Sequence, residues 1–134
     1  MTTTIDATLT IAAWDESTIA TFDDGTKLTR AEVTLQEGSD GLTSGSFHSV
    51  MYYRADGTSS YSQVVHLHAT LQGRTGSFAL IGDGAYDGNS AVSWLRIIDG
   101  SGTGGLTGIT GSAESDSAKA EHPLMALELT YEFD

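Results

Sequence analysis

The sequence predicts an all-β fold, a single antiparallel β-barrel of eight strands, on three observations. The chain contains 18 Thr and 16 Gly but one Pro, and it lacks long stretches of the helix-forming residues Ala, Leu, Glu and Lys, whereas Thr favours strands and Gly favours turns. Apolar and polar residues alternate with a period of two in several segments, which is typical of half-buried strands. Turn-forming Asp and Gly residues separate these segments at short intervals.

Three segments carry the clearest alternation. Five apolar residues of the first segment share one face: Ile5, Ala7, Leu9, Ile11 and Ala13. The segments 30–36 and 125–133 alternate in the same way. We interpret all three as antiparallel strands that bury one face and expose the other.

Further strands are expected at 18–22, 44–54, 59–71, 77–82, 91–98 and 106–112. The polar stretch 111–123 is expected to be a mobile loop before the last strand. A meander of eight or nine short strands must protect its edges, and closure into an eight-stranded barrel does so while leaving a small interior. The sequence shows no internal repeat, and it predicts one domain over residues 1–134.

The composition excludes several classes of function. Eighteen acidic residues against six basic ones give a net charge of −12, so neither nucleic acid nor a membrane surface is expected as a partner. The absence of Cys excludes disulfides, thiolate catalysis and Cys-ligated zinc. No apolar run approaches the ~20 residues of a membrane span, and the first residues lack the features of a secretory signal. A cytoplasmic location is therefore expected.

Five short motifs follow one another along the chain: WDE at 14–16, KLTRA at 27–31, YRADG at 53–57, GRTGSF at 73–78 and the glycine-rich 100–111. Their order and spacing resemble the bacterial family called domain of unknown function 3224, whose members look like allene oxide cyclase barrels. The resemblance implies an eight-stranded allene oxide cyclase-like barrel, often in a small homo-oligomer. Better-known relatives of this barrel bind an apolar reactive molecule and steer its ring closure or coupling without a cofactor. No cofactor is therefore expected, and a shared fold does not by itself carry a shared reaction.

The chain departs from this family at three positions, where members tend to carry acidic residues and this sequence has His48, Val65 and His68. His66 and His68 point to the same face of one strand, and a hairpin register that pairs apolar residues adds His48 to that face. Three imidazoles could hold zinc, or one could act as a general base. The alternation favours a position outside the barrel, on solvent or at a subunit interface. No metal is predicted.

The expected ligand is a small apolar or amphipathic molecule inside the barrel. If the protein is an enzyme, it is a cofactor-free isomerase or cyclase, and four residues are candidates for its catalytic groups: His48, Tyr53, His66 and His68. Aromatic and apolar residues with a few polar tips make the usual walls of such a site. Seven are expected to line it: Phe47, Met51, Tyr61, Val65, Phe78, Trp94 and Tyr131. The alternatives are a non-catalytic carrier or sensor, or a barrel with a filled core that acts through its outer surface.

Overall fold

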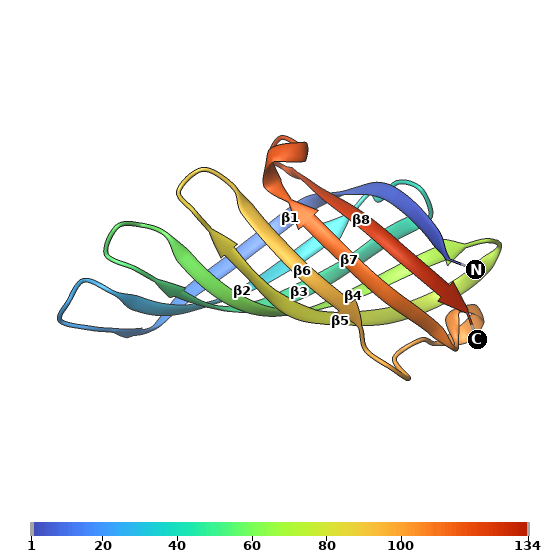
Figure 1. Ribbon diagram of the computed structural model, residues 1–134, viewed down its shortest axis with the longest axis horizontal. Coiled ribbons are helices and arrows are strands. Elements are labelled where there is room, and N and C mark those ends of the chain that lie inside the picture. The colour runs from blue at the N-terminus through green and yellow to red at the C-terminus, as the bar shows by residue number, and fades with distance from the viewer. Residues whose placement is uncertain (1, 134) are drawn as a thin grey trace.

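The computed structural model describes residues 2–133, and in that range the chain forms eight strands and no α-helix. The strands are β1 (Thr3–Thr21), β2 (Lys27–Gln36), β3 (Leu42–Tyr53), β4 (Ser59–Leu71), β5 (Arg74–Tyr86), β6 (Ala91–Ile97), β7 (Ile109–Asp116) and β8 (Leu124–Phe133). Two short 3₁₀ turns, η1 (Gly104–Leu106) and η2 (Ser117–Lys119), lie before and after β7. Figure 1 shows the strands running obliquely around one long molecule, with both chain ends at the same end.

Each strand pairs antiparallel with the next, and β1 pairs with β8 to close the ring. The closing ladder runs from Thr3 opposite Tyr131 to Thr10 opposite Leu124. Closure leaves neither terminal strand with an unpaired edge. The prediction of an all-β, eight-stranded antiparallel arrangement is confirmed.

Several predicted strand boundaries are wrong, as at 77–82, where β5 extends over Arg74–Tyr86. The segments expected at 5–13 and 18–22 merge into one strand, β1, which ends at Thr21 and stays paired with β2 through two register shifts. Residues 113–116, expected in a mobile loop, lie in the second half of β7 and pair with β8, as Ala113 does with Leu129. This half of the strand was missed because its residues are small and mostly polar and show little apolar alternation.

The two ends of the ring differ in their interior. Connections 37–41, 72–73 and 98–108 lie at one end, which we call the packed end, and large apolar side chains fill the interior there. Ten of them are fully buried: Leu9, Leu35, Leu42, Leu67, Phe78, Leu80, Leu106, Ile109, Leu127 and Leu129. The other four connections, 22–26, 54–58, 87–90 and 117–123, lie at the opposite end, which we call the mouth (Figure 1).

The glycine-rich segment 100–111 helps to close the packed end. The Thr103 amide donates to the Ser77 carbonyl oxygen at 2.8 Å, and η1 buries Leu106. A side chain at Gly76 would place its Cβ 1.9 Å from the Thr103 carbonyl oxygen, so this close backbone approach requires glycine. The glycines here serve packing.

The outer face of the ring carries mainly polar residues, together with scattered exposed apolar ones such as Val50, Val64 and Trp94. Across residues 2–133, no helical segment has the length and apolar character needed to cross a membrane.

Candidate functional site

The interior at the mouth is open and forms a cavity of about 410 Å³, which we call the mouth cavity. Apolar and small residues make most of its wall: Ile11, Trp14, Phe47, Met51, Val65, Ala91, Leu95, Ala120, Leu124, Met125 and Ala126. Polar side chains interrupt this wall: Ser49, Tyr53, Ser59, Tyr61, Gln63, Tyr86, Ser93, Ser115, Ser117 and His122. Apolar walls with a few polar groups are the ordinary composition of a small-molecule site.

Small residues at inward positions explain why this half of the ring is open. One inward row crosses five strands through paired residues: Met51, Tyr61, Gly84, Ser93 and Ser115. Three of these five are Gly or Ser, so little side-chain volume enters the interior. A row nearer the packed end is built from larger residues: Val33, Phe47, Val65, Leu80 and Ile97. The change in residue size along the strands therefore leaves the cavity.

Tyr61 lies across Gly84 in this inner row. A Cβ added to Gly84 would come within 2.6 Å of three Tyr61 side-chain atoms, so the tyrosine occupies the space that the glycine leaves. The Tyr61 hydroxyl and the Ser93 Oγ are 3.0 Å apart and share a hydrogen bond. Burial raises the pKa of Tyr61, against the opposing effect of the Ser93 bond, and keeps the phenol protonated.

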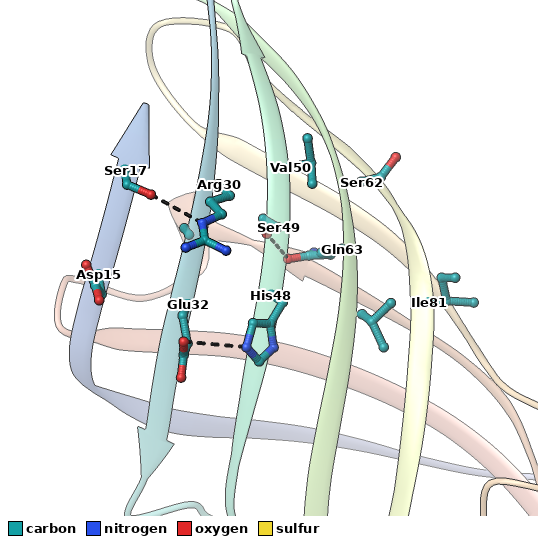
Figure 2. Close-up of a pocket in the computed structure, with 12 residues that line it drawn as sticks. Asp15, Ser17, Arg30, Glu32, His48, Ser49, Val50, Ser62, Gln63 and Ile81 are labelled. Atoms are coloured by element: carbon teal, nitrogen blue, oxygen red, sulfur yellow. Dashed lines mark hydrogen bonds and ion pairs between the residues drawn. The ribbon is translucent and has the colours of Figure 1, made fainter. Parts of the chain in front are cut away.

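A second polar pair, Ser49 and Gln63, is buried in the wall. Ser49 Oγ donates to Gln63 Oε1 at 3.3 Å (Figure 2). Gln63 also lines the mouth cavity, and within residues 2–133 no buried side-chain nitrogen or oxygen lacks a hydrogen-bond partner. The Gln63 Nε2 group can donate to a molecule in the cavity.

A β-bulge turns two further residues, Trp14 and Glu16, to the inner side of β1, and Trp14 lines the mouth cavity. Ile11 pairs with Leu35 and Ala13 with Thr34, so Ala12 has no partner on β2. One extra residue reverses which side chains face inward. Trp14 consequently lies opposite the buried Val33, and the Trp14 ring packs edge-to-face on Phe47, with centroids 5.9 Å apart.

The same reversal places Glu16 on the inner side of β1, opposite the buried Ala31, although its side chain is exposed and lies outside the lining of the mouth cavity. Three side chains donate hydrogen bonds to its carboxylate. Trp14 Nε1 lies 2.9 Å from Oε1, while Thr29 Oγ1 and Tyr53 Oη lie 2.9 and 2.8 Å from Oε2. Partial burial tends to raise the pKa of Glu16, but these three bonds and the charge of Lys27 outweigh it and hold the pKa below its usual value. Glu16 is therefore an oriented carboxylate that stays ionised near neutral pH.

The pKa of Tyr53 shifts in the opposite direction to that of Glu16. Burial, the hydrogen bond to Glu16 and the Glu16 charge raise the pKa of Tyr53 to about 12, against a small opposing effect of Thr29. The Lys27 Nζ group lies over the Tyr53 ring, 5.0 Å from its centroid. At neutral pH the Tyr53 phenol is a neutral group whose one hydrogen is engaged by Glu16.

The three histidines lie on the outer face, apart from the mouth cavity. As the register argument predicted, His48, His66 and His68 share a face, but all three are exposed. His48 Nε2 is 3.7 Å from Glu32 Oε2, and the His66 and His68 rings are 5.0 Å apart. In the described chain no three His, Cys, Asp or Glu side chains are grouped to hold a metal ion. A substrate inside the ring would not contact these histidines, so their predicted catalytic role does not fit their placement.

His48 instead borders a groove of about 430 Å³ on the outside of β1–β5, which Figure 2 shows. Two of its polar contacts are already made within the protein, since Arg30 Nε donates to Ser17 Oγ at 3.3 Å and His48 lies beside Glu32. Val50 and Val64 in this groove are exposed. The groove is an open surface of the sheet, and the mouth cavity is the better candidate site.

The structure brings five of the eleven predicted site residues together. Phe47, Met51, Tyr53, Tyr61 and Val65 all line the mouth cavity. Two predicted residues, Phe78 and Tyr131, are buried but do not line it. Trp94 is on the outer face and 57% exposed, so its predicted place in the wall is wrong. The outward position of Trp94 could have been predicted, because Leu95 and Ile97 face inward and neighbouring residues of a strand point to opposite faces.

Sequence reasoning missed Trp14, Glu16, Ser49, Gln63 and Ser93. Gln63 and Ser93 sit at inward positions that strand parity identifies, but Ser and Gln are not apolar and were therefore passed over. Trp14 and Glu16 depend on the bulge at Ala12. The residues around it, Ala12 and Ala13, give no signal of a bulge, since neither is Gly or Pro.

Comparison with known proteins agrees with this fold and names no activity. No curated protein matches the chain. A crystal structure of a protein of unknown function from the DUF3224 family of Shewanella oneidensis MR-1 matches with a TM-score of 0.78 and 21% sequence identity, covering 100% of this chain and 99% of that one. The family model described as "Protein of unknown function (DUF3224)" matches residues 5–131. The chain therefore belongs to the DUF3224 family.

Proposed function

We propose that the protein binds a small apolar or amphipathic molecule in the mouth cavity. The observation that carries this proposal is the contrast between the two ends of one interior, since large side chains fill the packed end while small ones leave about 410 Å³ open at the mouth. Ligand cavities range over about 300–1,000 Å³. A filled barrel that acts only through its outer surface does not account for this opening.

Binding without chemistry agrees best with the protonation states of the Tyr53–Glu16 pair. An efficient general acid or base has a pKa near the working pH. The pKa of Tyr53 is raised to about 12 and that of Glu16 is lowered, so both lie far from neutrality. This pair is suited to orient a bound molecule, and it is poorly suited to exchange protons with it.

Cofactor-free isomerisation or cyclisation, as in allene oxide cyclase-like barrels, is the alternative function. One observation favours it, namely that Tyr53 lines the cavity and could donate or accept a proton at a bound substrate. The cavity would then fold the substrate into a reactive conformer. In that case Tyr53→Phe would lower turnover at least tenfold, or about 1.4 kcal/mol of barrier, without unfolding the chain.

Self-association belongs to the same proposal. Exposed apolar residues on the outer face, Val50, Tyr52, Val64 and Trp94, support a small homo-oligomer. The net charge of −12 supports neither nucleic acid nor an anionic membrane surface as a partner, and we propose a cytoplasmic location. Light scattering coupled to size exclusion would measure the subunit number.

The binding proposal can be tested with N-phenyl-1-naphthylamine, a neutral apolar dye whose fluorescence rises in a dry site. Val65→Phe adds volume inside the cavity, where Val65 is 2% exposed, and should weaken dye binding at least tenfold. Val64→Phe makes the same change one residue away on the outer face, where Val64 is 43% exposed, and should leave binding unchanged. Circular dichroism would verify that both variants are folded.

Saturable binding by wild type and Val64→Phe, with loss in folded Val65→Phe, would support the proposal. Equal binding by all three proteins would place the dye outside the mouth cavity and contradict it. Absence of dye binding to the wild type, across a range of concentrations, would also contradict it.

A further inference from the structure

The polar groups of the mouth cavity differ in what they offer a ligand. The Tyr53 hydroxyl gives its hydrogen to Glu16 Oε2 at 2.8 Å, a charge-assisted bond that is stronger than one to the Met51 sulfur at 3.7 Å. The oxygen of Tyr53 is then left as an acceptor. Donating to a carboxylate also makes that oxygen a better acceptor, because hydrogen bonds in a chain polarise one another.

Glu16 is fixed in this arrangement from three sides. Trp14 and Thr29 donate to its two oxygens, which orients the carboxylate toward Tyr53. Thr29 is buried in the wall of β2, which anchors the group to the sheet. A negative charge therefore stays next to the polar rim of the mouth cavity.

The residues around the mouth cavity add further negative charge to that of Glu16. No Lys or Arg is among the described residues that line the cavity. The four connections at the mouth carry five acidic residues, Asp23, Asp24, Asp56, Asp87 and Glu121, against Arg54, Lys119 and one histidine, His122. Lys27 is nearby, but its Nζ lies over the Tyr53 ring and only partly offsets Glu16.

We propose that the mouth cavity selects amphipathic molecules whose polar head donates a hydrogen bond and carries no negative charge, such as an alcohol or an amine. The head would donate to Tyr53 Oη beside Glu16, and the apolar tail would lie against Phe47, Met51 and Val65. A carboxylate or phosphate head offers Tyr53 no hydrogen and is repelled by Glu16. This inference rests on the proposed binding function and adds the chemical class of the ligand.

Displacement of N-phenyl-1-naphthylamine by three probes with the same tail length, 1-decanol, decylamine and decanoate, tests the selection at pH 7. We expect decanol and decylamine to displace the dye at concentrations at least tenfold lower than decanoate. A tenfold preference corresponds to about 1.4 kcal/mol, which one charge a few ångströms away can supply at a protein surface.

Two charge-matched variants assign the selection to Glu16. Glu16→Gln should reduce the preference for decanol over decanoate to about threefold or less, because the repulsion is removed. Asp15→Asn removes one negative charge from the neighbouring residue, which pairs with Glu32 on the outer face, and should keep the tenfold preference. Circular dichroism would establish that each variant is folded.

The outcomes separate this inference from the function on which it rests. If the dye does not bind to wild type, the binding function itself fails. If the dye binds but decanoate displaces it as well as decanol does, the proposed ligand class is overturned. If Asp15→Asn and Glu16→Gln reduce the preference for decanol over decanoate by the same factor, the role of Glu16 is overturned. If Glu16→Gln does not fold, the proposed ligand class is tested by the order in which the three probes displace the dye from the wild type and by the Tyr53→Phe variant. Tyr53→Phe should lose affinity for decanol and not for decanoate.

Discussion

Tyr53 and Glu16, 37 residues apart in sequence, meet at the mouth of the ring through a 2.8 Å hydrogen bond from the phenol to the carboxylate. The bond exists because Ala12 is an unpaired bulge residue, which reverses the following part of β1 and places Glu16 on the side that Tyr53 reaches at the rim of the mouth. Its effects on the two pKa values are opposite, and together they make an acceptor phenol beside a fixed negative charge.

Removal of the Tyr53 hydroxyl should cost stability. Tyr53→Phe leaves Glu16 with two donors in place of three, and we expect the free energy of unfolding to fall by about 1 kcal/mol, as for one hydrogen bond in a partly exposed setting. Tyr52→Phe is the matched control, because Tyr52 points outward and has no recorded hydrogen bond in the described chain. Urea unfolding of both variants would measure the difference, and equal losses would show that the Tyr53–Glu16 bond contributes nothing.

The Glu16 contribution should depend on pH. Its pKa is lower in the folded chain than the usual 4.5, so ionised Glu16 stabilises the fold above pH 4.5, and this stabilisation is lost as pH falls below that value. The difference in unfolding free energy between wild type and Glu16→Gln should be largest at pH 7 and shrink below pH 4. Chemical unfolding at both pH values measures it, and a constant difference would contradict the assignment.

The packed end should carry much of the stability. Leu127→Ala removes a side chain that is 1% exposed in the filled interior, and such changes cost about 2–5 kcal/mol. Leu124→Ala, three residues earlier in β8, alters a residue that is 42% exposed at the mouth and should cost less than about 1 kcal/mol. Thermal or urea unfolding compares the two, and similar costs would argue against an interior filled only at one end.

Gly84 and Tyr61 should be energetically coupled. Gly84→Ala drives a methyl group into the Tyr61 ring, and overpacking of this kind costs about 1–3 kcal/mol. In a Tyr61→Ala background the ring is absent and the same change should be nearly neutral. A double-mutant cycle measures this coupling. Equal costs in both backgrounds would mean that Tyr61 does not lie across Gly84.

Strand parity predicted much of the interior and part of the site. Phe47, Met51 and Val65 alternate with outward-facing polar residues, so their inward position could be derived from sequence alone. Trp94 shows the limit of arguing from residue type, because an aromatic side chain was expected inside although Leu95 and Ile97 already determine the inner face of β6. Strand alternation gives the correct outward position of Trp94, whereas the expectation that an aromatic residue lines the cavity does not.

The part of the site that could not be predicted depends on a register change. From Ile5 to Ile11 the odd residues of β1 face inward, and the bulge at Ala12 transfers that face to Trp14 and Glu16. A bulge without Gly has no marker in the local sequence, and its position follows from pairing with β2. The hydrogen bonds among Glu16, Thr29 and Tyr53 come from three strands, so only the assembled sheet reveals them.

The central claim, that the mouth cavity is a binding site, can be tested most directly by nuclear magnetic resonance of methionine methyl groups during titration with 1-decanol. Met51 and Met125 both line the cavity, from β3 and β8. We predict that both signals shift and saturate together at a single decanol affinity, and that the shifts disappear in folded Val65→Phe. Saturable binding that leaves both signals unmoved, or no binding at all, would contradict the claim.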